Sequence, residues 1–215
     1  MVDRHHPAAS AIQEATASEP LTLEEEYDNQ QSWRTSHDKL TFIACEPPSG
    51  GDDARVVEAK VDDAAGKMRG DINFFLHVDD EDDDDEDEEA TGRRQSLETC
   101  LRGEVDVMIA AKEHRGRGAG EAAVRALLAY IRKNLTDIVK EYAQGESLDG
   151  DRTRLAGLMA RIKEDNAASR GLFGKLGFRQ EGEANYFGEV KMVMDWETVE
   201  GEDVALEYRE LAYMI

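Results

Sequence analysis

The stretch LRGEVDVMIAAKEHRGRGAGEAAVRALLAYIRKNL, residues 101–135, decides the fold. After Gly103 its first part alternates between apolar and polar side chains, and this period of two is typical of a strand. Residues 121–135 instead follow the 3.6-residue period of an amphipathic helix. The apolar positions of that helix are Val124, Leu127, Leu128, Ile131 and Leu135. The segment therefore predicts a strand, a glycine-rich loop and a helix, in that order.

Working outward, the same patterns predict a helix on each side of this unit and several strands. The helices are expected over residues 21–34, where Thr22 caps the start, and over 166–176, where Gly177 ends the helix. The strands are expected over residues 40–46, 70–78, 154–162 and 185–196, with a further short strand beginning at Phe178. A hairpin loop is expected over 52–66 and a mobile connection over 140–153. The order predicts an α/β fold in which helices flank a mixed sheet.

The charge is concentrated in one tract. Forty-eight acidic residues against 26 basic ones give a net charge of −22, and residues 79–89 supply eleven of the acids in one run. Such a run repels itself and buries nothing, so a disordered loop is expected over 79–95. Binding of this run to a basic partner stays open as an alternative. The net charge argues against nucleic acid and anionic membranes as partners.

The cysteines and the apolar runs argue against a metal site, a membrane span and a secretory signal. The two cysteines, Cys45 and Cys100, form no CxxC pair, so a metal site is not expected and both are expected to be reduced thiols. No run of 18 apolar residues suggests a membrane span, and residues 1–20 contain no apolar signal region. The cytoplasm or the nucleus is therefore the expected location.

The loop RGRGAG, residues 115–120, which we call the cradle, is the best candidate for a binding site. Alternating glycines let successive N–H groups converge, and the following helix adds the positive end of its dipole, so the loop suits a phosphate. Residues 111–134 carry a net charge of +4 within this acidic chain. The spacing fits neither a P-loop nor a Rossmann turn. A glycine-rich turn without a ligand remains the alternative.

Two signatures give the sequence a family resemblance. Arg115, Gly118 and Gly120 match the pattern R-x-x-G-x-G/A, and NAASRGLFGKLGF, residues 166–178, matches a second motif downstream. Both resemble the GCN5-related N-acetyltransferase (GNAT) superfamily. The blocks TASEPLTLEEEY, SWR, LTFI, GDINFFL and GEVDVMIA further resemble its N-acetyltransferase 9-like subfamily. The resemblance extends from about residue 12 to about residue 196.

The resemblance implies a mostly antiparallel central sheet flanked by helices. It implies a poorly patterned segment over 1–15, an N-acetyltransferase domain over 16–197 and a C-terminal tail over 198–215. The subfamily normally begins with a further strand before TASEP, so this first strand is expected to be missing and activity to be affected. Many relatives carry a tyrosine, as general acid, where Phe173 stands here.

The same resemblance, together with the residues, suggests roles in acetyl transfer from acetyl-CoA to an amine. Glu104 is the first candidate for the base, Asp106 the second, and both are expected on one strand face; a salt bridge or a solvated face is their alternative. Tyr186 is a candidate substitute acid, with core packing as its alternative, and Trp33 lines the substrate side or packs in the core. The residues expected to bind acetyl-CoA are Met108, Ile109, Ala110, Arg115, Gly116, Arg117, Gly118, Ala119, Gly120, Asn166 and Ser169.

These expectations describe an N-acetyltransferase whose acceptor is the amine of a protein or peptide. The alternative is a catalytically impaired protein of the same fold that binds CoA or a partner. Asn166 and Ser169 also fit plain helix-cap residues. The sequence does not choose among a protein N-terminus, a lysine side chain and a small amine, nor does it give the oligomeric state.

Overall fold

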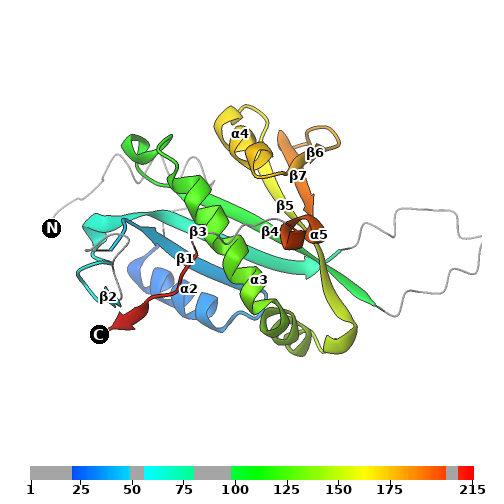
Figure 1. Ribbon diagram of the computed structural model, residues 1–215, viewed down its shortest axis with the longest axis horizontal. Helices are drawn as coiled ribbons and strands as arrows, with labels where there is room; N and C mark the ends of the chain where they lie inside the picture. Colours follow the sequence, from blue (N-terminus) through cyan, green and yellow to red (C-terminus); the bar gives the residue numbers. More distant parts are fainter. Residues whose placement is uncertain (1–20, 49–55, 80–97, 202–207) are drawn as a thin grey trace, which may run out of the picture.

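The computed structural model describes residues 21–48, 56–79, 98–201 and 208–215. The expected segment 1–15, the question of a first strand before TASEP, and nearly all of the expected loop 79–95 lie outside the described residues. A six-stranded sheet in the order β1-β3-β4-β5-β7-β6 forms the centre of the molecule (Figure 1). Its strands are β1 (Lys39–Cys45), β3 (Met68–Val78), β4 (Thr99–Ile109), β5 (Thr153–Lys163), β6 (Arg179–Glu181) and β7 (Glu189–Asp195).

The sheet is mostly antiparallel, as expected, because only the central pair β4–β5 is parallel. That parallel pair is joined by α3 (Ala119–Gly145), the long helix that crosses the sheet in Figure 1. A short helix, α4 (Ala167–Lys175), follows β5, and α5 (Trp196–Gly201) follows β7. The predicted N-terminal helix is α2 (Leu23–Thr35), and the side chain of Thr22 caps it in a capping box.

One face of the sheet carries the hydrophobic core. Side chains of α3, α4 and α5 pack there on alternate residues of the strands, such as Phe74, Val105 and Leu158. The opposite face, which we call the open face, carries the other set of residues. Strand register aligns Lys39, Phe75, Glu104 and Met159 in one row across it. This second face is unevenly covered: Met159 is 2% exposed, whereas Asp106, two residues beyond Glu104 on β4, is exposed.

The two central strands separate part of the way along. β4 and β5 pair from Thr99 and Thr153 as far as Glu104 and Met159, and no pairing between them continues beyond that point. The last residues of β4, 105–109, and of β5, 160–163, therefore diverge, and we call this opening the fork. Each branch of the fork leads into a helix, β4 into α3 through the cradle and β5 into α4.

Two parts of the chain are more regular than the sequence predicts. Residues 140–145 belong to α3 rather than to a mobile connection, because Tyr142 and Ala143 continue its buried stripe. The expected hairpin loop over 52–66 contains β2 (Val56–Glu58), which pairs in parallel with β8 (Ala212–Met214) of the C-terminal tail. The tail is also held to α3 by the ion pair of Lys133 with Glu210, at 2.6 Å.

Candidate functional site

The cradle forms an open start to α3. Gly116 and Gly118 have φ angles of 69° and 87°, in the left-handed region that favours glycine. Gly118 is the N-cap residue and offers no side-chain cap. The first helical hydrogen bond runs from the N–H of Ala122 to the carbonyl of Gly118. The N–H groups of residues 119–121 therefore have no partner within the helix, and they are the donors that a phosphate group would meet.

The two arginines of the cradle have different surroundings. The Arg115 guanidinium turns back toward β4, donating from Nε to the Ile109 carbonyl at 2.7 Å and from Nη2 to the Ala110 carbonyl at 3.0 Å. Arg115 therefore fixes the cradle to the end of the strand. Arg117 is exposed, and across the described ranges no ion pair is formed by its side chain. Its charge thus remains available to an anion at the cradle.

The structure refines which backbone groups at the end of β4 face the fork. The N–H of Ala110 donates to the Arg69 carbonyl at 2.9 Å, so it points toward β3. The Met108 carbonyl lies against Gly70 of β3 so closely that a Cβ on Gly70 would be 1.7 Å from its oxygen. Peptide groups alternate in direction along a strand, so those of Val107 and Ile109 face the fork. Sequence reasoning named Ile109 but missed Val107.

The start of α4 is closed by its own residues. The Asn166 side chain accepts a hydrogen bond from the Ser169 N–H at 3.1 Å, which is the geometry of a helix cap. Both residues lie beside the end of β5, and their contact with acetyl-CoA stays a prediction. Phe173 points into the core, where it is 2% exposed and packs edge-to-face on Phe178 at 5.0 Å. Its position therefore does not face the fork.

Glu104 lies where the fork begins, on the open face. It is the last residue of β4 that pairs with β5, and its carboxylate forms an ion pair with Arg161 of β5. Asp106 lies two residues further along β4, opposite Asn73 of β3, so both acids share the open face as expected. The structure thus places two carboxylates beside the divergence of the strands.

Asp106 belongs to a polar network that sequence reasoning did not find. Asn73 is 9% exposed; it accepts from the Thr41 hydroxyl at 2.8 Å and donates to Asp71 at 2.8 Å. Burial of the carboxyl group raises the pKa of Asp106, although part of the residue is exposed, while Asn73 and Lys39 oppose that shift. Burial likewise raises the pKa of Asp71, and the charge of Asp106 adds to this rise. The two carboxyl groups are therefore held nearer to their neutral forms than free aspartates.

Tyr186 lies on the turn between β6 and β7 and is 97% exposed, so core packing is wrong for this residue. Phe187 beside it is 71% exposed, and the two rings meet edge-to-face at 5.5 Å. The Asn185 side chain accepts from two backbone N–H groups within the turn, and Lys163 at the end of β5 donates to the Phe187 carbonyl at 2.9 Å. The turn, whose backbone is held by these hydrogen bonds, therefore presents two exposed aromatic rings next to the β5 branch of the fork.

Trp33 also lies outside the core. α2 buries none of its residues, and Trp33 is 45% exposed. The Lys39 ammonium lies 4.4 Å from the centre of the Trp33 ring and 4.8 Å from that of Phe75. Since Lys39 and Phe75 belong to the open face, Trp33 lies at the β1 side of that face and not in the core.

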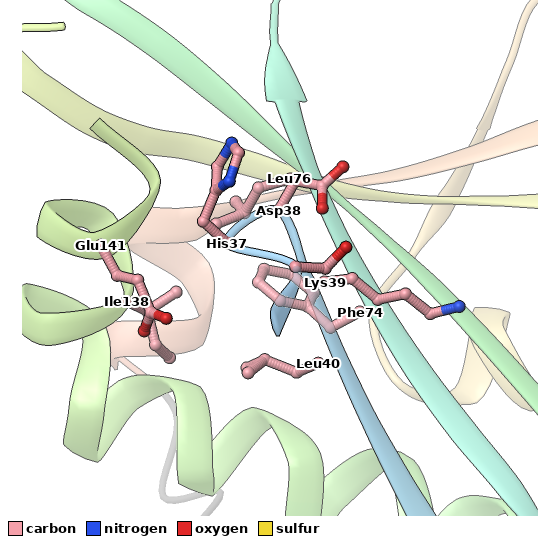
Figure 2. A pocket seen from close by; sticks show the side chains of 9 residues that line it. His37, Asp38, Lys39, Leu40, Phe74, Leu76, Ile138 and Glu141 are labelled. Atoms are coloured by element: carbon pink, nitrogen blue, oxygen red, sulfur yellow. The ribbon is translucent and has the colours of Figure 1, made fainter. Parts of the chain in front are cut away.

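A separate pocket between the start of β1 and the C-terminal half of α3 is shown in Figure 2. Its volume is about 20 Å³, room for a single water molecule, so it does not fit a cosubstrate. His37 at its edge contacts Glu146 at 2.8 Å. Among the described residues, no group of three or more His, Cys, Asp or Glu side chains is placed to hold a metal ion. No helix in the described ranges is long and apolar enough to cross a membrane.

Comparison with known proteins identifies the family. The family model of the acetyltransferase (GNAT) domain matches residues 9–179. An N-acetyltransferase 9-like protein from Caenorhabditis elegans is 34% identical over 83% of this chain and 69% of the relative. The alpha/beta-tubulin-N-acetyltransferase 9 of Homo sapiens is 33% identical over 84% of this chain and 67% of the relative.

A solved chimera of the spermidine N-acetyltransferase from Vibrio cholerae is 13% identical, with a TM-score of 0.48 over 85% of this chain and 81% of that one. The family is established by the sequence matches, which extend across both the cradle and the start of α4. The chain therefore belongs to the GNAT family, resembles its N-acetyltransferase 9-like members, and is an acetyl-CoA-dependent N-acetyltransferase.

Proposed function

We propose that the acceptor is an amine of a protein or peptide, bound across the open face at the fork. The observation that carries this proposal is the exposed aromatic pair Tyr186–Phe187 beside the β5 branch. Exposed rings on a rigid turn provide contact area at little cost in conformational entropy, and such rings are enriched at protein interfaces. A polypeptide is long enough to contact both Glu104 and this turn, which are linked along β5 by Arg161 and Lys163.

The residues of the fork and the cradle fit acetyl-CoA. The unpartnered N–H groups of residues 119–121 and the charge of Arg117 suit its diphosphate. The Val107 carbonyl and the Ile109 N–H suit an extended amide-bearing arm, while the Ile109 carbonyl is occupied by Arg115. When bound, acetyl-CoA supplies an acetyl group activated as a thioester. The contribution of this chain is to hold the donor at one end of the fork and the acceptor amine at the other.

Glu104 is proposed to take the proton from the acceptor ammonium, because only a neutral amine attacks a carbonyl carbon. One carboxylate oxygen receives the proton, and Arg161 keeps the carboxylate oriented at the start of the fork. Asp106 lies on the same face and is the second candidate. Tyr186, exposed on its turn, is assigned to acceptor contact rather than to proton donation.

The names of the relatives suggest one acceptor that can be tested. Two relatives of this chain, in Drosophila melanogaster and Homo sapiens, are named alpha/beta-tubulin-N-acetyltransferase 9. We therefore propose tubulin as one candidate acceptor.

The test is mass spectrometry of tubulin dimers, peptides that end in their N-terminal sequences, and small polyamines after incubation with labelled acetyl-CoA. Label on protein or peptide amines is expected, and label on polyamines alone would overturn the proposal. Glu104→Gln should lower kcat about 100-fold with unchanged acetyl-CoA affinity. Release of no CoA with any acceptor, despite binding of acetyl-CoA, would favour the catalytically impaired alternative.

The acceptor surface is tested separately with the double variant Tyr186→Ala and Phe187→Ala. Both rings are exposed, so folding and acetyl-CoA binding should be preserved. The KM for a peptide acceptor should rise about tenfold, since each ring contributes contact area. An unchanged peptide KM would remove these rings from the acceptor site.

A further inference from the structure

A carboxylate stands in the first turn of α3, directly after the cradle. Glu121 is the third residue of this helix, and its own N–H is one of the donors left without a helical partner. An acidic side chain here stabilises the helix, but it also places a negative charge where the diphosphate of acetyl-CoA is expected. Two like charges at one helix end oppose each other, so the carboxylate needs a compensating cation.

Two cations meet the Glu121 carboxylate, one on each oxygen. Lys175, the last residue of α4, lies with its Nζ 2.5 Å from Oε2, and Arg125 lies with its Nε 3.2 Å from Oε1. These partners, Lys175 first and Arg125 second, lower the pKa of Glu121. Arg125 belongs to the same helix one turn later, whereas Lys175 comes from the other branch of the fork.

The contact of Leu172 with Gly120 brings the end of α4, and with it Lys175, close to the start of α3. Leu172, one turn before Lys175 in α4, lies so close to Gly120 that a Cβ there would be 3.3 Å from its Cδ2 atom. The last turn of α4 therefore lies beside the first turn of α3. The Lys175 side chain is 64% exposed, and its ion pair with Glu121 bridges these two neighbouring helices.

We propose that Lys175 is a positioning residue for acetyl-CoA, acting through Glu121. It holds the carboxylate aside and neutralises it, so that the cradle presents a net positive field to the diphosphate. This inference rests on the assignment of the cradle as the diphosphate site. A lysine that touched the phosphate directly would act without Glu121, and this difference makes the proposal testable.

The experiment is calorimetric titration of the full chain with acetyl-CoA for Lys175→Met, Glu121→Gln and the double variant. Lys175→Met should weaken binding about fivefold, because a charge at a helix end contributes about that factor. The double variant should regain the affinity of Glu121→Gln alone. A double variant as weak as Lys175→Met would mean a direct phosphate contact, and an unchanged Lys175→Met would mean no role; either result overturns the proposal.

Two further measurements exclude a merely structural effect. Lys175→Arg keeps the charge and should bind acetyl-CoA like the unaltered chain, whereas loss of affinity in this variant would contradict the proposal. Steady-state kinetics of Lys175→Met should show a raised KM for acetyl-CoA, with little change in kcat or in melting temperature. The unaltered chain is the reference: if it bound no acetyl-CoA, the cradle assignment itself would fail, which is distinct from failure of the Lys175 proposal alone.

Discussion

The two branches of the fork end in helices that begin in opposite ways. α3 begins at Gly118, which has a left-handed backbone and no capping side chain, so its first N–H groups are open. α4 begins at Asn166, whose side chain occupies the Ser169 N–H. Both helix starts carry the positive end of a dipole, but α3 leaves the N–H groups of residues 119–121 open, whereas at α4 the Ser169 N–H is taken by Asn166 and the Ala167 N–H by the Asp165 carbonyl. The lesson is that an anion site needs an unsatisfied helix start, and a helix start alone is insufficient.

The largest effect is expected from closing the open start. Gly118→Glu would strain a φ of 87° and place a negative charge at the diphosphate site. Like charges brought together cost several kcal/mol, so acetyl-CoA affinity should fall about 100-fold or more in a calorimetric titration. Gly118→Asn is the matched control, because asparagine tolerates the left-handed region, and it should bind far better than the glutamate variant. Unchanged affinity of Gly118→Glu would disprove the cradle.

The paired part of β4 should depend on a glycine for a different reason. A Cβ on Gly103 would lie 2.1 Å from the ring of buried Phe74, so Gly103→Ala overfills the core. A loss of about 2 kcal/mol in the free energy of unfolding is expected from chemical denaturation. Gly171→Ala is the control on the other branch: a Cβ there has no atom within 4 Å, so alanine should stabilise α4 slightly. Equal effects of the two changes would refute this packing argument.

Opening the closed start of α4 should affect stability rather than binding. Asn166→Ala removes the cap and should lower the free energy of unfolding by about 1 kcal/mol. If Asn166 acts only as the helix cap, acetyl-CoA affinity should change little, and Asn166→Asp should retain the stability because it retains the cap. A large loss of affinity without loss of stability would instead make Asn166 a cofactor contact and weaken the comparison between the two helix starts.

The smallest effect concerns Asp106 on the β4 branch. Its pKa is raised by burial, so the folded state binds the proton more tightly than the unfolded chain does. Stability therefore falls as the pH rises from the unfolded pKa to the folded one, and the cost persists above that range. Asp106→Asn should thus raise the melting temperature slightly at neutral pH, and this gain should vanish below about pH 4. A gain that stayed constant across that range would argue against the raised pKa.

The fold was predictable where local period and long-range burial coincide. β4, α3, β5 and α4 follow from hydrophobic spacing, and the cap at Thr22 follows from residue type. The last two turns of α3 were missed because polar residues surround Ile138, Val139 and Tyr142, although their spacing continues the buried stripe. The pairing of β2 with β8 joins two three-residue strands far apart in the chain, and no local pattern predicts such a pair.

In the site, too, features within one segment were predictable from the sequence, whereas contacts between segments were not. The glycines of the cradle have a sequence signature, and so does the acidic pair on β4, because both depend on spacing within a single segment. The network through Asn73, the ion pair of Glu104 with Arg161, and the contact of Lys175 with Glu121 each join different segments. The core-packing alternative for Tyr186 is wrong, and composition alone does not reveal that its turn holds the ring out to solvent.

The strand ends on either side of the acidic tract are held by their own contacts. β3 and β4 stay paired to Val78 and Leu101, and the half-buried Arg102 holds Asp79 through two hydrogen bonds of 2.9 and 2.7 Å. On the return side, Glu98 meets Arg154 at 3.4 Å. The ends of β3 and β4 are therefore held by contacts that do not involve residues 80–97. Because the two ends are held by contacts of their own, changes in the length or charge of the residues between Asp79 and Glu98 should leave the pairing of β3 with β4 intact.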